Sequence, residues 1–566
     1  MHMQTLLKNG KVINVFTDSL IDADVLIEDE VIIGVGDYHD YDADNCIDVS
    51  GKVICPGFID GHIHIESTML TPAELAKVSL PHGTTSIFAD PHEIANVSGT
   101  TGIEYMLEMS EGLPLHVYIM LPSCVPATPF DESGAVLNAP ELSPLYGKDR
   151  VVGLAEMMNY PGLVAGVPFV VDKTKECKDN NRVIDGHAPM LTGRDLDRYI
   201  SYGIASDHET TSEAEAKERI SKGQYIMVRE GTAAKNLEAL LPLFDEPWNH
   251  RAMLCTDDRH PADLLSEGHI DNIVRHAIAA GKDPLVTIRM ATINAAQHFG
   301  QRYIGAVAPG YRADILVLND LASVDINDVY SAGVKVVDNK TVCDIKSPVP
   351  SAEKDAIVRK SFNLAELSPN DLAIDATGKR QCRVIDIVPG QLLTNELIYD
   401  VDFDNGNNGI DVENDILKLA VIERHKNTGH KGIGFIRGIG LKAGAIASSV
   451  SHDSHNLIVI GTNDADMIAV ANYIREMGGG CAIVVDGKVV AEEALPIAGL
   501  MTDKSAEEIA RENENLRETV KKIGVNENIE PFMNMAFVSL PVIPSLKMST
   551  QGLVDVIKFE RVDLFI

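Results

Sequence analysis

Eight short apolar segments recur between residues 53 and 257, and they constrain the fold more than any other feature of the sequence. They are Val53–His64, Thr84–Asp90, Leu115–Leu121, Val151–Met157, Arg182–His187, Ile204–His208, Tyr225–Glu230 and Ala252–Asp257. Their lengths indicate buried strands, and helix-like segments such as Pro72–Leu80 and Ser212–Ser221 separate them. Eight strand–helix units in about 200 to 250 residues are typical of a (β/α)8 barrel.

All of these apolar segments except Leu115–Leu121 end in or beside ionisable residues, at the strand ends where such barrels carry out their chemistry. His62 and His64 are two residues apart, so they project from the same side of a strand. Taken singly, a histidine or acid at such a place is more often a structural residue or a helix cap. The whole series instead predicts a metal site, with the ligands His62, His64, Glu156, His187, His208 and Asp257.

Stretches rich in β residues flank the barrel on both sides. Residues 5–50 alternate apolar and polar side chains between turns, and matching stretches return at 308–318 and 333–337. The predicted fold is therefore α/β: a TIM-like (β/α)8 barrel, a flanking β-sandwich built from both sides of it, and a C-terminal α+β domain. The expected boundaries are 1–52 and 301–348 for the sandwich, 53–300 for the metal-dependent barrel and 349–566 for the C-terminal domain.

Charge and composition exclude several classes of partner. The formal net charge of −34 over 566 residues disfavours nucleic acid and anionic membrane surfaces. No segment approaches the roughly 18 apolar residues of a transmembrane helix, and the start lacks a signal-peptide pattern. The eight scattered cysteines are typical of a reduced, cytoplasmic protein. We expect a cytoplasmic enzyme with a small-molecule substrate and, because barrels of this class often self-associate, a homo-oligomer.

The motifs resemble those of the amidohydrolase superfamily, metal-dependent hydrolases on a TIM-like barrel with a flanking β-sandwich. The segments that carry this resemblance are Pro56–His64, His187, His208 and Asp257. Longer segments resemble, more closely, the adenine deaminase family of bacteria and archaea; they are 62–67, 88–96, 153–158, 185–189, 206–209 and 451–456. The resemblance covers essentially the whole chain. It implies hydrolysis of adenine to hypoxanthine and ammonia.

The fourth predicted strand bears on the kind of metal centre. Many superfamily members bridge two metal ions with a carboxylated lysine there, but residues 151–158 contain no lysine and offer Glu156. Because a glutamate has two oxygens, it can bridge two cations in a binuclear site. The other ligands then form two sets, His62, His64 and Asp257 around one ion and His187 and His208 around the other. Such ligands suit Mn²⁺, Fe²⁺ or Zn²⁺; the resemblance favours Mn²⁺ or Fe²⁺, and we take Mn²⁺ as the expected metal.

The implied reaction needs an activated water, because C6 of adenine is a poor electrophile. Between two cations the pKa of water falls from ~15.7 toward ~7, so a metal-activated hydroxide is available at neutral pH. Asp257 can accept its proton and carry it to the leaving amine. A carboxylic acid that protonates N1 would make C6 more electrophilic, and the spacing does not rank the two candidates, Glu93 and Glu230.

Other ionisable residues are candidates for contacts with the substrate. Arg229 can bind a ring nitrogen or form a structural ion pair. His92 can ligate a further metal, lie next to the metal ligands without binding the metal itself, or cap the next helix. For the loop that carries His452 and Asp453, closing the substrate pocket is favoured over a separate metal site. The expected substrate contacts are Arg229, Asp90, His92, His452 and Asp453.

Two other functions remain open. One is a cyclic-amide hydrolase of the dihydroorotase or hydantoinase type, against which the absent fourth-strand lysine and the added C-terminal domain count. The other is a non-catalytic scaffold barrel. A scaffold should lack ligands, whereas all six ligand positions are filled in this sequence.

Overall fold

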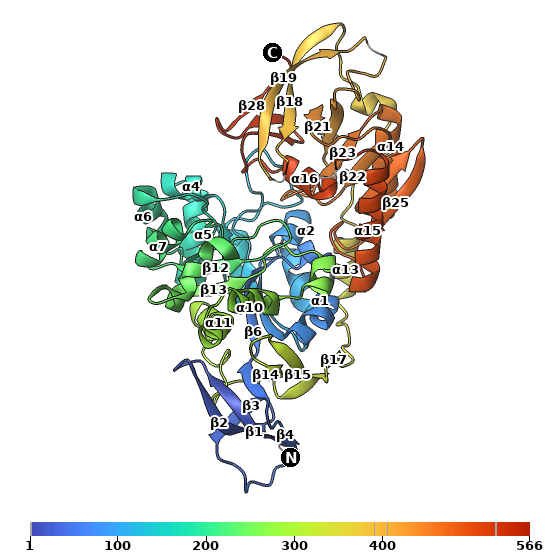
Figure 1. The fold of residues 1–566 in the computed structure, drawn as a ribbon. Coiled ribbons are helices and arrows are strands. Elements are labelled where there is room, and N and C mark those ends of the chain that lie inside the picture. The colour runs from blue at the N-terminus through green and yellow to red at the C-terminus, as the bar shows by residue number, and fades with distance from the viewer. Residues whose placement is uncertain (1–2, 390, 405, 527–528) are drawn as a thin grey trace. The chain divides into compact units, whose positions relative to one another are not determined.

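The computed structural model describes residues 3–389, 391–404, 406–526 and 529–566 (Figure 1). The chain forms two compact units. Unit 1 comprises residues 1–91, 106–123 and 138–349, and unit 2 comprises residues 92–105, 124–137 and 350–566. None of the helices in the described ranges is long and apolar enough to cross a membrane.

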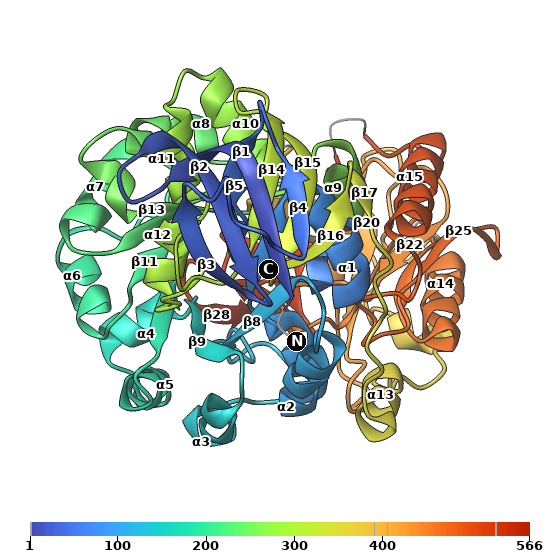
Figure 2. The ribbon, with the colours of Figure 1, turned by 90° about the horizontal axis from the view of Figure 1, so that it is seen from below.

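In unit 1, the two β-rich stretches that flank the barrel share one sheet of nine strands. Its strands are β1 (Gln4–Asn14), β2 (Ser19–Glu28), β3 (Val31–Gly36), β4 (Asn45–Asp48), β5 (Val53–Pro56), β14 (Ile315–Asp320), β15 (Asp325–Ser331), β16 (Val334–Asp338) and β17 (Thr341–Val342). Strand β5 joins the two parts, since it pairs with β1 on one side and with β14 on the other (Figure 2). The expected β unit built from both sides of the barrel is confirmed.

The barrel itself consists of eight parallel strands. They are β6 (Phe58–Ile63), β7 (Thr84–Ala89), β8 (His116–Leu121), β9 (Val151–Met157), β10 (Val183–Gly186), β11 (Ser206–Asp207), β12 (Tyr225–Arg229) and β13 (Ala252–Cys255). Five of these strands form one sheet and three form another. Two single parallel bridges, Ile184 to Ile204 and Ile63 to Asp257, close the ring. The TIM-like barrel is thus confirmed.

The first predicted strand, Val53–His64, is divided between the two sheets at Gly57. Its first part is β5 of the nine-stranded sheet and its second part is β6 of the barrel. A side chain at position 57 would place its Cβ 2.2 Å from Thr85 Oγ1, so only glycine allows this close approach.

Helices and 3-10 turns connect the strands of unit 1. The helices are α1 (Pro72–Ser79), α3 (Ala139–Leu142), α4 (Tyr160–Ala165), α5 (Pro168–Asp179), α6 (Gly193–Ser201), α7 (Glu213–Ser221), α8 (Leu237–Leu240), α9 (Pro261–Ser266), α10 (Ile270–Ala279), α11 (Pro284–Met290) and α12 (Ile293–His298). Between β7 and β8 the chain also forms α2 (His92–Met109), most of which belongs to unit 2. Thr71 and Ser212 cap α1 and α7 by accepting backbone N–H groups. Helix α2 begins ten residues before the predicted Gly102–Ser110, and Gly99 (φ 61°) kinks it.

The interior of the barrel is apolar below the strand ends. Ile59, Phe88, Met120 and Met227 pack there, and the rings of Phe88 and Phe299 stack with centroids 3.7 Å apart. Because these strand bodies are filled with apolar side chains, the buried ionisable residues gather at the carboxyl ends of the strands. This arrangement places the candidate metal site at the carboxyl end of the barrel.

Unit 2 contains an eight-stranded sheet in the order β19-β18-β21-β20-β23-β22-β24-β25. Its strands are β18 (Lys379–Ile387), β19 (Thr394–Asp402), β20 (Leu417–Ile422), β21 (Lys431–Arg437), β22 (Ala445–Ser448), β23 (Leu457–Gly461), β24 (Gly480–Val485) and β25 (Lys488–Ala494). A second, smaller sheet contains β26 (Leu546–Ser549), β27 (Gly552–Asp555) and β28 (Glu560–Val562). The α+β character predicted for the C-terminal part is confirmed.

Helices cover both faces of the large sheet of unit 2. They are α14 (Asp464–Met477), α15 (Ala506–Lys522) and α16 (Pro531–Val538), and α13 (Ala352–Arg359) precedes them in the chain. Met467 and Val470 of α14 pack on one face. Leu516 of α15 and Met535 of α16 pack on the other. The strands alternate their side chains between these two cores.

Candidate metal centre

The six predicted ligands come together at the carboxyl ends of the barrel strands. They are His62 and His64 from the end of β6, Glu156 from β9, and His187, His208 and Asp257 from the ends of β10, β11 and β13. His187 is half-buried, and the other five are buried. Buried charged groups at this density need counter-charges or metal ions.

Glu156 lies at the middle of the cluster. Its Oε1 lies 3.3 Å from His64 Nε2 and 3.9 Å from His62 Nε2. Its Oε2 lies 2.6 Å from His187 Nδ1 and 3.2 Å from His208 Nε2. Each carboxylate oxygen therefore faces a different pair of imidazoles, which is the arrangement that a bridging ligand requires.

Asp257 supplies a second carboxylate on the side of His62 and His64. Its Oδ1 lies 3.2 Å from His64 Nε2 and 3.6 Å from His62 Nε2. Its backbone has a φ of 60°, and its N–H donates to the carbonyl of His62 over 2.8 Å. The left-handed conformation, which aspartate tolerates better than most residues, lets the strand end turn while it remains bonded to β6.

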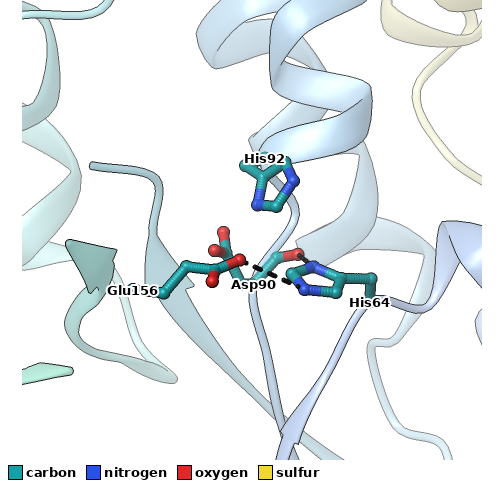
Figure 3. Close-up of side chains that lie close together, drawn as sticks. All are labelled: His64, Asp90, His92 and Glu156. Atoms are coloured by element: carbon teal, nitrogen blue, oxygen red, sulfur yellow. Dashed lines mark hydrogen bonds and ion pairs between the residues drawn. The ribbon is translucent and has the colours of Figure 1, made fainter. Parts of the chain in front are cut away.

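A main-chain hydrogen bond orients the ring of His64. Its Nδ1 lies 3.0 Å from the carbonyl oxygen of Asp90 and must donate, so Nε2 is left as the ligand atom (Figure 3). One carboxylate oxygen of Asp90 lies within 4.8 Å of ligand atoms of His64 and Glu156. Asp90, predicted as a substrate contact, is thus also within reach of a cation held by His64. His92, which Figure 3 also labels, begins α2 two residues further along the chain.

One buried nitrogen tests whether a cation fits this place. In the described part of the chain, His62 Nε2 is among the buried side-chain atoms that have no hydrogen-bond partner. His62 Nε2 instead faces the carboxylates of Glu156 and Asp257. Leaving such a buried polar atom unsatisfied costs about 1–3 kcal/mol. An imidazole nitrogen aimed at two carboxylates is the arrangement that a divalent ion satisfies, and the donor set contains groups that could hold such an ion.

The surroundings favour the metal-binding charge state in His62, Glu156 and Asp257. Burial lowers the pKa of His62 well below its ordinary value, and His208 and His64 lower it further. Burial opposes ionisation of Glu156, but the charge and hydrogen bond of His187 outweigh it and hold its pKa well below the usual range. In Asp257 the charge of Arg229 has the same effect.

The other three histidines shift in the opposite direction, because neighbouring carboxylates outweigh burial and raise the pKa of His64, His187 and His208. In the absence of metal, His187 holds a proton. Burial would lower its pKa, but Glu209 and Glu156 outweigh burial and raise the pKa to about 9. A metal ion must displace that proton, so metal binding is expected to release protons.

Arg229 forms ion pairs with two carboxylates. Its Nη1 lies 2.5 Å from Asp257 Oδ2 and 2.5 Å from Glu209 Oε1. Of the two roles expected for Arg229, the structure shows the ion pair. Contact between Arg229 and a ring nitrogen of the substrate stays a prediction. Glu209, to which sequence analysis assigns no role, also lies 3.8 Å from His187 Nδ1 and from His208 Nε2. In the sequence, only the position of Glu209 directly after His208 could have indicated that it belongs to this group.

Asp60 was also missed, and it ties the first and last barrel strands together. Its carboxylate accepts hydrogen bonds from the backbone N–H groups of His62 (3.2 Å) and Thr256 (3.1 Å) and from the Thr256 hydroxyl (2.5 Å). His269 Nε2 lies 3.2 Å from the same carboxylate. Asp60 therefore fixes the backbone beside two ligands.

The two candidate acids lie in different surroundings. Glu230 Oε1 accepts a hydrogen bond from the N–H of Leu237, the first residue of α8, and burial raises the pKa of Glu230. Glu93 Oε1 lies 2.8 Å from His452 Nδ1, and Glu93 Oε2 accepts from His455 Nε2.

The structure also brings His92 and Asp453 into the group around Glu93, within unit 2. His92 Nε2 lies 3.3 Å from Glu93 Oε1 and 3.9 Å from Asp453 Oδ1. The predicted residues His92, Glu93, His452 and Asp453 thus form one buried cluster, to which His455 is added. A role for this cluster in substrate binding stays a prediction.

Comparison with known proteins agrees with the fold. The model described as "Amidohydrolase family" matches residues 53–342, and the model described as "Adenine deaminase C-terminal domain" matches residues 391–560. The barrel with its histidine and carboxylate centre is therefore that of an amidohydrolase.

The relatives give a narrower family. "Adenine deaminase 2" of Carboxydothermus hydrogenoformans is 47% identical over 98% of this chain and 96% of that protein. Adenine deaminases of Desulfatibacillum aliphaticivorans and Geobacillus kaustophilus are 44% and 45% identical, over 99% and 98% of this chain and 97% and 95% of theirs. The chain belongs to the adenine deaminase family. These relatives do not favour the cyclic-amide hydrolase alternative.

Proposed function

We propose that this chain hydrolyses adenine to hypoxanthine and ammonia at the six-residue centre. The observation that carries the proposal is the placement of Glu156, whose two oxygens each face a different histidine pair. The near full-length similarity to adenine deaminases supports adenine as the substrate.

The expected metal is Mn²⁺, with Fe²⁺ or Zn²⁺ as alternatives. His62, His64 and Asp257 would hold one ion, His187 and His208 would hold the other, and Glu156 would bridge them. Bound there, the two ions would lower the pKa of water and so supply hydroxide at neutral pH. Imidazole and carboxylate donors suit all three metals, and the family favours the first two.

Asp257 is the proposed proton shuttle. Its Oδ2 is held by Arg229, whereas its Oδ1 faces the imidazoles of His62 and His64. The positive charge of Arg229 keeps the carboxylate ionised against burial, so it can accept a proton from the attacking water. It then delivers that proton to the amine that leaves C6.

Of the two candidate acids, Glu230 has the surroundings of a proton donor. Burial raises its pKa, so it retains a proton more readily than an exposed glutamate does. The histidines around Glu93 outweigh burial and hold its pKa well below the ordinary range. We therefore assign Glu230 as the acid for N1, and Glu93 as an ionised acceptor for an N–H group of the substrate.

The experiment is an ammonia-release assay on Mn²⁺-loaded protein with adenine, cytosine, guanine and adenosine. Ammonia from adenine alone is the expected result. Parallel assays with a dihydropyrimidine and a hydantoin measure ring opening by absorbance. Ring opening without ammonia release from adenine would contradict the proposal.

We further propose a cytoplasmic homo-oligomer. The eight cysteines are all free thiols, which suits a reducing compartment. Light scattering on the purified protein gives the molar mass of the assembly, and a mass of one chain would contradict the oligomer.

A further inference from the structure

The loop at residues 451–456, between β22 and β23, is unusual because it is buried. His452, Asp453 and His455 are 9%, 3% and 1% exposed. Connecting loops normally run over the surface, where water satisfies their polar groups. A buried loop with two histidines therefore needs internal partners for its polar groups.

Neighbouring elements of unit 2 hold this loop in place. The N–H of His452 donates to the carbonyl of Ala536 in α16 over 2.9 Å. The buried guanidinium of Arg424, which follows β20, donates to the carbonyl of His455 over 2.6 Å. His425 Nε2 donates to the carbonyl of Ser454 over 2.7 Å. The loop is thus bonded to a strand end on one side and to a helix on the other.

These contacts fix which nitrogen of His455 carries the proton. The N–H of Ser451 donates to His455 Nδ1 over 3.2 Å, so that nitrogen accepts. The proton of the neutral ring therefore lies on Nε2, which faces Glu93 Oε2. A metal ligand would need a lone pair on Nε2. Although Glu93, His452 and His455 lie close enough to hold a cation, His455 is oriented as a hydrogen-bond donor.

His452 holds the other oxygen of the same carboxylate. Its ring stacks on Phe537, with centroids 4.6 Å apart and planes at 24°, and its Nδ1 lies 2.8 Å from Glu93 Oε1. Each oxygen of Glu93 therefore has its own imidazole donor. Two donors on fixed rings leave the carboxylate little freedom to rotate.

We propose that His452 and His455 are positioning residues, and that this loop serves to hold the carboxylate of Glu93 in one orientation for the substrate. Glu93 lies three residues after Asp90 along the chain, in the first turn of α2. The inference deepens the proposed function and rests on it. It gives the loop a role other than covering the pocket or binding a metal of its own.

The test uses pairs of variants of similar size. One variant of each pair keeps an N–H donor toward Glu93 and the other lacks it. Gln at 455 can place an amide N–H near the position of His455 Nε2, and Asn at 452 can place one near His452 Nδ1. Leucine at either position removes the donor. We expect His455→Leu and His452→Leu to lower kcat/KM for adenine about 10- to 100-fold, and His455→Gln and His452→Asn to restore most of it.

A double-mutant cycle then shows whether the histidines act through Glu93. Glu93→Gln combined with His455→Leu should be no worse than Glu93→Gln alone, because the same interaction is lost. Additive losses, or a Gln variant as impaired as the Leu variant, would overturn the inference. So would a wild-type kcat/KM in His455→Leu.

Two measurements on the full chain do not depend on activity. Nitrogen-15 NMR of histidine-labelled protein should show His455 as the neutral tautomer with its proton on Nε2. Metal analysis should give the same metal content in wild type and His455→Leu; loss of an ion would indicate a metal site. If wild type releases no ammonia from adenine, the proposed function fails, and the tautomer still decides whether His455 donates.

Discussion

Replacing Glu156 with glutamine tests the centre most directly, because one side chain contacts both histidine pairs. Glutamine keeps the shape but replaces one oxygen with an NH2 group, which would face a histidine pair where a cation must bind. We expect Glu156→Gln to lose metal and activity together, with turnover at least ~100-fold lower at matched metal concentration.

The same change has a stability effect that can be worked from His187. Its pKa rises from 6.5 to about 9 in the folded protein, and each pKa unit corresponds to about 1.4 kcal/mol, so the shift corresponds to about 3 kcal/mol. Because the folded pKa is raised, this stabilisation is full below pH 6.5 and is lost as the pH rises toward 9. Glu209 supplies part of it, so ~3 kcal/mol is an upper bound for the contribution of Glu156.

Metal analysis, ammonia release and thermal unfolding of the metal-free protein measure these effects. The metal-free variant should unfold at a lower temperature than wild type near pH 6, and the two should converge near pH 9. Glu93→Gln is the matched control, since Glu93 is another buried, histidine-bonded glutamate, and it should keep both metals. Two metals per chain in Glu156→Gln would refute the bridging role.

The other predictions concern proton transfer and buried charge. Asp257→Asn should lower kcat far more than it raises KM for adenine; a change mainly in KM would argue against the shuttle. Glu230→Gln should lower kcat and remove one limb of the pH–rate profile, and an unchanged profile would exclude Glu230 as the acid. Burial raises the pKa of Glu493 from 4.5 to about 8, so wild-type stability should fall across that range as the unfolded carboxyl releases its proton first. Glu493→Gln should show a smaller fall in thermal unfolding curves, and parallel curves would contradict that pKa.

The barrel was predictable because its strands are apolar and ionisable residues lie at the strand ends, both of which are local patterns. The structure differs from the sequence-based prediction at two glycines. At Gly57 the absent side chain allows a close contact with Thr85, at the position where one apolar segment is divided between two sheets. At Gly99 the helix α2 is kinked, and the prediction missed the turns that precede this residue. Neither consequence follows from hydrophobic periodicity alone.

Contacts between distant residues were not predictable in the same way. Glu93 is bonded to His452 and His455, 359 and 362 residues away along the chain. The loop motif marked the histidines, but no spacing related them to Glu93. Asp60 and Glu209 were missed for a related reason, because their roles depend on Thr256 and Arg229 in other strands.

The charge states of Glu93 and Glu230 show why spacing could not rank the two acids. Both residues lie near the end of a barrel strand in the sequence, and both are buried. Burial alone would raise the pKa of each. Three histidines around Glu93 reverse that effect, whereas the carboxylate of Glu230 accepts from a backbone N–H and the effect of burial prevails. The opposite directions of these two pKa shifts therefore depend on neighbours that tertiary folding supplies.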